Sequence, residues 1–201
     1  MEDRGEAPAT GFAIPRSKTL AVIAVFSSLI ALGTIFSIPL PAPLYEITWS
    51  PPIYLALAVL VDPATAFDAT AMGGFIGEAF NVAFRGGGSP IYPFGMVWAR
   101  GPEVFIVAWA KNRGTRTLVI AMVAATVFET LAFFLSDWAF YNYGLFGYVC
   151  TNANGTPCSS VFDALGVASS DFFTMVDAAF IPVALVLIRA ARPSFRRLGF
   201  K

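Results

Sequence analysis

Histidine is absent from the 201-residue sequence, and cysteine occurs only at Cys150 and Cys158. Without histidine, the chain cannot form a Ser-His-Asp or Cys-His nucleophile, an HExxH zinc site or a histidine proton relay. Two thiols are too few for a structural zinc site, which takes four nitrogen or sulfur ligands. Neither a P-loop nor a GxGxxG fingerprint is present, so any dependence on ATP has to come from a partner protein. We therefore expect a protein that is not an enzyme, with no metal and no cofactor.

Charged residues are also scarce, at 13% of the chain, where a soluble domain carries about 25%. Hydrophobic residues make up 57%, and the mean hydropathy is +0.69. This composition excludes a disordered chain, a nucleic-acid binder and an ordinary soluble enzyme. It predicts an integral membrane protein embedded in the lipid bilayer.

Six apolar runs approach the length of about 20 residues that a helix needs to cross a bilayer. The first is too long for a cleaved signal peptide and has no clear cleavage site after it. We therefore predict an all-α fold: a six-helix membrane domain over 18–190, between an N-terminal arm (1–17) and a basic tail (191–201). The predicted spans are Leu20–Leu40, Ile47–Val61, Ala64–Phe84, Ile91–Ala110, Leu118–Leu135 and Leu165–Ile188.

Basic residues fix the predicted orientation, because cytoplasmic segments of membrane proteins are enriched in lysine and arginine. With both termini in the cytoplasm, only Arg85 and Arg100 fall elsewhere. The predicted location is the cell membrane, with outer loops over 39–48, 85–90 and 136–164. The cytoplasmic set is Arg4, Arg16, Lys18, Lys111, Arg113, Arg116, Arg189, Arg192, Arg196, Arg197 and Lys201.

The longest predicted outer loop, 136–164, contains both cysteines and the sequence Asn154-Gly155-Thr156. Cys150 and Cys158 enclose a short segment on an oxidising face, which favours a disulfide over two free thiols. Asn-Gly-Thr matches a glycosylation pattern on the correct side, although such a short motif also occurs by chance.

Small residues recur on one face of two predicted spans. Helices in lipid associate by close packing, which small residues permit. In the third span we favour packing inside the bundle for this stripe. In the first span, packing inside the bundle and docking of a partner both remain open. The two stripes are Ala21, Ala24, Ser28 and Ala31 in the first span, and Ala69, Gly73 and Gly77 in the third.

Ionisable residues inside the spans are the main functional signal, because a charge in hydrocarbon is costly unless it is paired or solvated. Arg100 and Glu103, three residues apart, are predicted to pair. Acids outnumber this one base six to one, which a cationic or hydrogen-bond-donating ligand would offset. Carboxylates left unpaired are expected to be protonated. The set is Asp68, Glu78, Arg100, Glu103, Glu129, Asp171 and Asp177.

Several of these residues are predicted to converge in the outer half of the bundle, near aromatic side chains. Fixed polar groups between flat aromatic walls suit a small, partly aromatic, polar metabolite. Two alternatives remain open: a structural Arg100–Glu103 ion pair, and an aromatic belt at the membrane interface. The predicted substrate-binding residues are Glu46, Trp49, Asn81, Tyr92, Arg100, Glu103, Glu129 and Asp171, with Trp98, Trp138 and Tyr141 as further aromatic candidates.

Three segments together resemble a known family. They are the first span AVIAVFSSLIALGTIFSIPLP, the short second span in YEITWSPPIYLALAVLVDP, and the Gly/Ala-rich DATAMGGFIGEAFN. With six spans in about 200 residues, they resemble the substrate-binding S component of energy-coupling-factor (ECF) vitamin transporters over roughly 18–190.

This resemblance implies a vitamin-like substrate bound near the outer face, below the first outer loop. It implies a transmembrane coupling subunit that docks on Ala24 and Ser28, flanked by Ala21 and Ala31, and two ATPase subunits. Metal-transporting members of that group use N-terminal histidines, which this chain lacks, so a metal substrate is excluded. The long cysteine-bearing loop is not a feature of the resemblance.

The leading hypothesis is therefore a substrate-capture subunit of an ATP-driven importer, with no nucleic-acid partner. One alternative is a proton-coupled secondary transporter that uses Glu129, Asp171 or Asp177, although the two halves show no inverted repeat. Others are a lipid-modifying enzyme that uses carboxylates and a structural subunit of a membrane complex.

Overall fold

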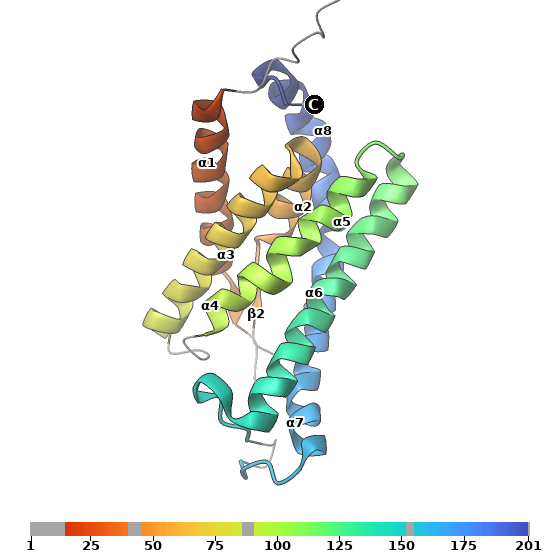
Figure 1. Ribbon diagram of the computed structural model, residues 1–201. Helices are drawn as coiled ribbons and strands as arrows, with labels where there is room; N and C mark the ends of the chain where they lie inside the picture. Colours follow the sequence, from red (N-terminus) through yellow and green to blue (C-terminus); the bar gives the residue numbers. More distant parts are fainter. Residues whose placement is uncertain (1–14, 40–45, 86–90, 152–154, 201) are drawn as a thin grey trace, which may run out of the picture.

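The computed structural model describes residues 15–39, 46–85, 91–151 and 155–200. Within these ranges the chain is helical apart from one short hairpin and connecting segments, which confirms the predicted all-α fold (Figure 1). The helices are α1 (Arg16–Ile35), α2 (Pro51–Leu60), α3 (Pro63–Arg85), α4 (Tyr92–Gly95), η1 (Met96–Arg100), α5 (Gly101–Ala110), α6 (Thr115–Tyr143), η2 (Leu145–Gly147), α7 (Val161–Ala168), η3 (Ser169–Phe180) and α8 (Ile181–Leu198).

Three helical segments of the described chain are long and apolar enough to cross a membrane. They are α1, α6 and the continuous run Val161–Leu198, which comprises α7, η3 and α8. The second predicted span is helical only in α2, whose ten residues extend about 15 Å, half the thickness of a hydrocarbon core. The prediction of a helix over Ile47–Val61 is therefore too long.

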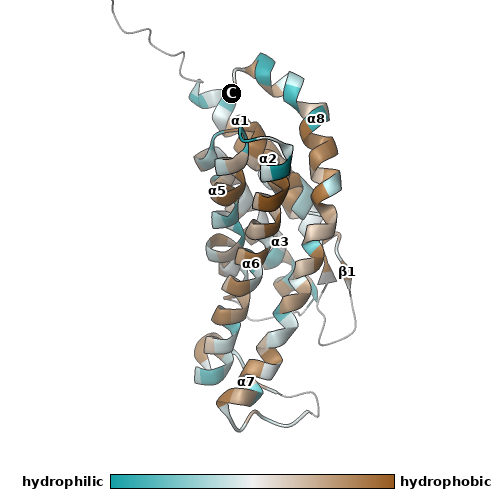
Figure 2. Ribbon diagram, turned by 90° about the vertical axis from the view of Figure 1, so that its right-hand side faces the viewer, coloured by the Kyte–Doolittle hydropathy of each residue, from teal (hydrophilic) through white to brown (hydrophobic). Residues whose placement is uncertain are grey.

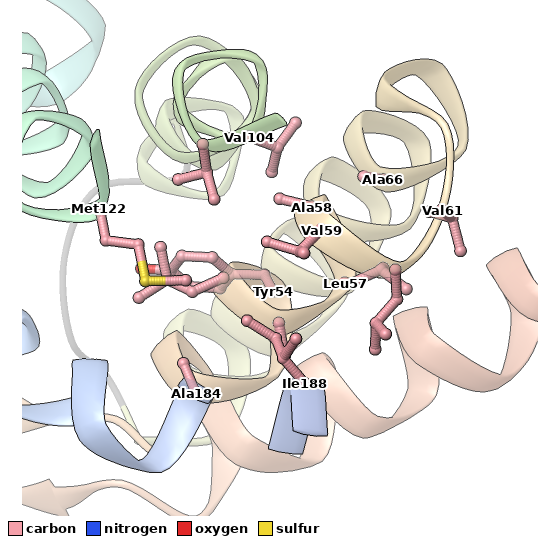
Figure 3. Packing of buried hydrophobic residues seen from close by; sticks show 14 of the residues in the cluster. Tyr54, Leu57, Ala58, Val59, Val61, Ala66, Val104, Met122, Ala184 and Ile188 are labelled. Carbon is pink, nitrogen blue, oxygen red and sulfur yellow. The ribbon is translucent and has the colours of Figure 1, made fainter. Parts of the chain in front are cut away.

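Helix α2 lies at the centre of the bundle rather than on its surface. It packs against α1, α3, α5 and α8, and every residue except Ile53 is buried. Figure 3 shows Tyr54, Leu57 and Val59 of α2 among apolar side chains from neighbouring helices. A helix buried on all sides has no polar face, which explains why this segment reads as a short continuous apolar run. Pro51 and Pro52 begin it, at positions where the missing N–H groups cost no helical hydrogen bond.

Helices α1 and α3 approach each other closely through the glycines of α3. A Cβ atom at Gly73 would lie 2.7 Å from Cβ of Ile30, and one at Gly77 would lie 2.6 Å from Cβ of Thr34. Ala69, on the same stripe, is fully buried. The stripe in the third predicted span therefore packs inside the bundle, as favoured from the sequence.

A two-stranded hairpin follows α1 and sets the position of the chain before α2. Strand β1 (Ile38–Pro39) pairs antiparallel with β2 (Glu46–Ile47). The backbone N–H of Trp49 then donates to the carbonyl oxygen of Gly33 at 2.8 Å. A Cβ atom at Gly33 would lie 2.9 Å from the backbone nitrogen of Ser50, so glycine permits this close approach.

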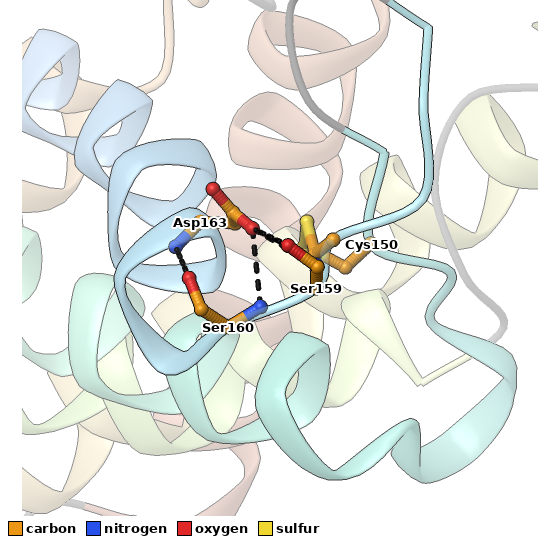
Figure 4. The surroundings of a disulfide bond; sticks show 5 residues. Cys150, Ser159, Ser160 and Asp163 are labelled. Atoms are coloured by element: carbon orange, nitrogen blue, oxygen red, sulfur yellow. Dashed lines mark hydrogen bonds between the residues drawn. A yellow bond between two sulfur atoms is a disulfide. The ribbon is translucent and has the colours of Figure 1, made fainter.

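The predicted outer loop over 136–164 is helical at both ends. Helix α6 continues to Tyr143, because the polar pair Ser136-Asp137 does not interrupt the helix and Asp137 is buried. Gly144, in a left-handed conformation, ends α6. At the other end, Ser160 and Asp163 form a capping box that begins α7 at Val161 (Figure 4).

The segment between α6 and α7 contains a disulfide between Cys150 and Cys158, whose Cα atoms lie 5.3 Å apart. The backbone N–H of Cys158 donates to the carbonyl oxygen of Cys150 at 3.0 Å. Asn154, the predicted glycosylation residue, lies outside the described residues.

The predicted basic tail over 191–201 is largely the last part of α8, which runs to Leu198. Phe195 and Phe200 are buried, and the ring of Phe195 lies 5.7 Å from that of Phe26 in α1. The ammonium group of Lys18 donates to the carbonyl oxygen of Leu198 at 3.4 Å. The start of α1, the α5–α6 turn and the end of α8 therefore share one end of the molecule, which we call the basic end (Figure 1).

The outer surface of the bundle carries many large apolar side chains. Leu20 is 65% exposed, Phe84 75% and Val186 64%. Figure 2 shows brown, hydrophobic ribbon along most of the length of the helices, with polar residues concentrated towards the ends. A surface of this kind needs an apolar environment or partner.

Candidate functional site

Arg100 enters the bundle interior from a π-helical turn, η1. Pro102 follows two residues later and has no N–H with which to bond the carbonyl group of Trp98, so the regular α-helical pattern is interrupted. The chain widens into η1 before resuming as α5 at Gly101. Such turns recur at functional sites, and this one presents a buried guanidinium group to the centre of the bundle.

The guanidinium group of Arg100 is held by contacts from three other segments. Its Nε atom donates to Oε1 of Glu129 at 2.8 Å, and its Nη1 atom donates to Oγ of Ser50 at 3.3 Å. Its Nη2 atom lies 4.0 Å from Oδ2 of Asp177. The Cζ atom also lies 5.4 Å from the centre of the Tyr54 ring, a cation–π contact.

Glu129 is fully buried in α6, and both of its carboxylate oxygens have partners. Oε1 accepts from Arg100, while Oε2 accepts from the hydroxyl group of Tyr54 at 3.2 Å. The pair is therefore embedded in a hydrogen-bonded network, the arrangement that buried charges require.

The predicted pair between Arg100 and Glu103 does not form. Glu103 is fully buried, and neither of its carboxylate oxygens has a hydrogen-bond partner among the described residues. The π-helical turn changes the register before α5, and the guanidinium group points to Glu129 instead. Glu103 is thus a buried carboxyl group outside the ion pair of Arg100 and Glu129.

The helical run Val161–Leu198 places several of its polar residues on one side because its central part has an unusual conformation. Its central part, η3, is a 3₁₀-helix of twelve residues, much longer than most. A 3₁₀-helix has three residues per turn, so Asp171, Thr174 and Asp177 fall on the same side. In an α-helix, positions 171 and 177 would face different directions. Pro182, at the start of α8, removes an N–H group that an α-helical pattern would use.

Asp171 and Thr174 also connect η3 to α6. The hydroxyl groups of Thr174 and Thr130 lie 2.6 Å apart, and that of Thr174 donates to the backbone oxygen of Asp171 at 2.7 Å. Oδ2 of Asp171 has no hydrogen-bond partner among the described residues, although the residue is buried. This carboxylate is therefore available to a bound molecule.

A cavity of about 50 Å³ lies beside this network. Its polar lining includes Arg100, Asp171 and Asp177, and its aromatic lining includes Tyr92 and Phe133. Ligand pockets commonly have volumes of about 300–1,000 Å³. The bundle is therefore closed around its polar centre in this conformation.

The structure brings only some of the predicted binding residues to this cavity. Tyr92 lines it, with its ring 5.8 Å from that of Phe133. Asn81 is buried elsewhere and donates from Nδ2 to the carbonyl oxygen of Thr34 at 3.4 Å. Trp49 is 48% exposed and contacts Phe180. The side chain of Glu46 lies outside the described residues.

Several polar members of the site were not selected from the sequence. Ser50 and Tyr54 contact Arg100, and Thr48 lies within hydrogen-bond distance of Ser50, at 3.1 Å. A single tyrosine in an apolar run such as PPIYLALAVL is common, so the sequence alone does not mark Tyr54 as a site residue. Asp177 is identifiable in the sequence as a charge within a predicted span, but its alignment with Asp171 depends on the 3₁₀ geometry.

The small-residue stripe of α1 is mostly on the outside of the bundle. Ala21, Ala24 and Ser28 are exposed, whereas Ala31 is buried. The hydroxyl group of Ser28 donates to the carbonyl oxygen of Ala24 at 2.8 Å, which turns its polar atom inward along the helix. Three of the four predicted docking residues therefore form a smooth exposed surface.

No protein-family model matches the chain, and no curated protein or solved structure is significantly similar to it. The class that the described residues define is an all-helical protein with three helices suited to crossing a membrane.

Proposed function

We propose that this protein is a membrane-embedded substrate-capture subunit of an ATP-driven importer for a vitamin or a related small metabolite. The observation that carries the proposal is the Arg100–Glu129 network beside a closed cavity, inside a bundle with an apolar exterior. A buried ionic network is costly to build and is typical of functional sites within a membrane.

The proposed membrane arrangement has six crossings in the cell membrane, with both termini in the cytoplasm. Among the described residues, α1, α2, α3, the run α4–α5, α6 and the run α7–α8 alternate in direction (Figure 1). The α5–α6 turn lies at the same end as the start of α1 and the end of α8 (Figure 1). The basic residues Lys18, Lys111 and Arg196 belong to this end. The positive-inside rule favours placing it in the cytoplasm. Helix α2, too short to cross alone, would lie within the bundle, shielded by its neighbours.

The charge balance of the interior supports a ligand that carries positive charge or hydrogen-bond donors. Arg100 is the one buried base in the described part of the chain, against six buried acids. Asp171 has an oxygen atom without a hydrogen-bond partner among the described residues, and it lines the same cavity as Tyr92 and Phe133. A flat metabolite with an amino or other donor group would satisfy that carboxylate and pack against the rings.

Binding of a vitamin-sized molecule requires the cavity to open, because about 50 Å³ is too small. Thr48, directly after β2, and Asp171, Thr174 and Asp177 of η3 line the cavity. We therefore assign the gate to η3 and to the segment that leads into α2.

The energy for transport would come from partner subunits, namely a transmembrane coupling subunit and two ATPases. Ala21, Ala24 and Ser28 of α1 supply the exposed small-residue surface for the coupling subunit. Ala31 is buried and is not included in this surface.

The first test is to purify the full-length protein in mild detergent from cells grown in rich medium and to identify the small molecules released on denaturation by mass spectrometry. The proposal predicts a stoichiometric, donor-bearing aromatic metabolite. Asp171→Asn should release none, because it replaces the carboxyl group that lines the cavity with an amide. Asp68→Asn makes the same chemical change at an exposed position of α3 and should retain the ligand. An empty wild-type protein, or equal retention by both variants, would contradict the proposed site.

A second candidate function, proton-coupled transport by the chain alone, is favoured by Glu103. This carboxyl group is fully buried without a hydrogen-bond partner among the described residues, as expected of a proton carrier. Uptake of the identified ligand into liposomes under a pH gradient, without ATPases, would favour this candidate. Loss of that uptake in Glu103→Gln, with ligand affinity retained, would assign the proton to Glu103.

A further inference from the structure

A recess at the basic end is separate from the polar cavity. It lies between the end of α2, the α5–α6 turn and α8, and its volume is about 70 Å³. Its polar lining consists of Lys111, Asn112, Arg192 and Arg196, and no Asp or Glu of the described chain contributes to it. Three cations and an amide therefore surround a small space.

The recess is built by ordered structure. Arg192 and Arg196 are four residues apart on α8 and share one face of the helix. Gly199, at a φ of 99°, ends α8, and the backbone N–H of Phe200 then donates to the carbonyl oxygen of Phe195 at 3.1 Å. Both phenylalanines are buried and line the recess together with the two arginines.

Lys111 completes the recess from the opposite side. Its ammonium group donates to the carbonyl oxygen of Val61 at 3.4 Å, at the end of α2. A second recess, of about 380 Å³, also includes Arg192 and Arg196 in its lining. Arg192 and Arg196 therefore line both the small recess and the larger recess along α8.

The chemistry of the small recess fits a phosphate group. Guanidinium groups bind phosphate oxygens through paired hydrogen bonds, and an ammonium group adds a point charge. A volume of about 70 Å³ is far below that of pockets for whole metabolites. The ligand would therefore enter with one small anionic group, and the rest of it would lie outside.

The position of the recess along α8 indicates the source of that phosphate. Exposed Val183, Val186 and Leu187 immediately precede Arg189, so the surface of α8 changes from apolar to basic within one turn. Figure 2 shows this change as a shift from brown to teal towards the end of α8. At the same end, Trp109 is 60% exposed and the Cζ atom of Arg113 lies 3.7 Å from its ring centre. Exposed tryptophan and arginine together are typical of the lipid headgroup level.

We propose that the recess formed by Lys111, Arg192 and Arg196 binds the phosphate group of an anionic phospholipid. The acyl chains would then lie against the apolar surface of α8. This inference rests on the proposed placement of the chain in a membrane, and it does not depend on the substrate-capture role. Basic recesses between helices on the cytoplasmic side are suited to such headgroups.

The test is a titration of the purified full-length protein with phosphatidylglycerol, with bound lipid counted by native mass spectrometry. Arg192→Gln/Arg196→Gln should weaken binding by roughly 25-fold, since each basic residue near an anionic headgroup contributes about 1 kcal/mol. Arg189→Gln/Arg197→Gln is the matched control, because it removes the same charge from the same helix outside the small recess. This control should keep most of the affinity. Arg192→Lys/Arg196→Lys retains both charges and should bind more tightly than the glutamine variant.

Equal loss in the two glutamine variants would overturn the proposal, because it would show diffuse attraction to the whole basic surface. Phosphatidylcholine bound as tightly as phosphatidylglycerol would also overturn it. Displacement of the lipid by millimolar inorganic phosphate would assign the recess to a soluble phosphate instead. If an acidic protein blocked lipid binding to the wild-type chain but not to the Arg192→Gln/Arg196→Gln variant, the recess would be assigned to a partner subunit.

Failure of this inference is distinguishable from failure of the proposed function. If alkaline washing removes the chain from membranes, the membrane placement fails and both proposals fail with it. If the chain stays in the membrane and retains a metabolite but no anionic lipid, only the lipid proposal fails.

Discussion

At the residue scale, Arg100 and Glu129 illustrate how strongly a buried charge depends on its partner. Removal of one member of a buried pair leaves the other without compensation and typically costs about 3–5 kcal/mol. Arg100→Ala should therefore lower the free energy of unfolding by about that amount, as measured by denaturant titration in mixed micelles. Loss of ligand binding in this variant would not by itself identify a ligand contact. Asp171→Asn is the better probe of the site for this reason.

The double variant Arg100→Met/Glu129→Gln is the control for that destabilisation. It removes both charges together, and glutamine keeps an oxygen acceptor for the hydroxyl group of Tyr54. It should recover most of the stability lost in Arg100→Ala. A double variant as unstable as the single one would show that the pair does not act as a unit.

Asp62, between α2 and α3, gives a pH-dependent prediction outside the helices. Partial burial opposes its ionisation, but hydrogen bonds from the side chain and backbone N–H of Thr65, at 2.6 and 2.9 Å, outweigh it. The pKa of Asp62 is therefore lowered. A lowered pKa contributes stability above the ordinary value of about 3.9, and this contribution is lost as pH falls through the lowered pKa.

Asp62→Ala should reduce the free energy of unfolding by about 1 kcal/mol at pH 7, because it removes the side chain that caps α3. The difference from the wild-type protein should shrink as the pH falls below about 4. Unfolding titrations at pH 7 and at acidic pH would measure it. A difference that is the same at both pH values would contradict an ionised cap.

The sequence identifies the charged members of the site better than it identifies their contacts. Arg100, Glu129 and Asp171 stand out because each interrupts an apolar run. Tyr54 and Ser50 do not, since one tyrosine or serine in such a run is common. The partner of Arg100 could not be derived from spacing, because the π-helical turn alters the geometry on which an i, i+3 argument relies.

At the element scale, the contact between α1 and α3 depends on glycine. Gly77→Ala should destabilise the fold by about 1–3 kcal/mol, since the new Cβ atom would overlap the side chain of Thr34. Gly166→Ala is the matched control, because a Cβ atom there meets nothing within 4 Å and alanine favours the helix by up to about 1 kcal/mol. Thermal unfolding of both variants in the same detergent would measure the contrast. A neutral Gly77→Ala would show that α1 can shift away from α3.

The approximate positions of the helical segments follow from apolar runs and turn residues, but their internal conformations do not. Pro102 and Pro182 mark the places where regular α-helical bonding is interrupted. They do not determine that η1 widens into a π-helix while η3 tightens into a 3₁₀-helix. Both η1 and η3 pack against α6, and the sequence of one segment does not contain these contacts. The alignment of Asp171 with Asp177 could therefore be seen only in the folded chain.

At the scale of the whole molecule, the start of α1, the α5–α6 turn and the end of α8 share one end, and the segment between α6 and α7 lies towards the other (Figure 1). That segment contains the disulfide. If the basic end is cytoplasmic, positions at the two ends must be accessible from opposite sides of the membrane. Single cysteines can be introduced into a Cys150→Ser/Cys158→Ser background at three exposed positions: Asn112 in the α5–α6 turn, Ser159 before α7, and Ser194 in α8.

A membrane-impermeant maleimide applied to intact cells should label Ser159→Cys, whereas Asn112→Cys and Ser194→Cys should react only after permeabilisation. The chain passes along the whole bundle in α6 between the first two positions and returns through η3 and α8 to the third. Labelling of all three from one side would contradict both crossings and, with them, the membrane placement. If Asn112→Cys and Ser194→Cys were labelled on intact cells and Ser159→Cys were not, the crossings would stand but the orientation would be reversed. The recess of Lys111, Arg192 and Arg196 would then face the outer leaflet, so this measurement also decides from which leaflet its phospholipid must come.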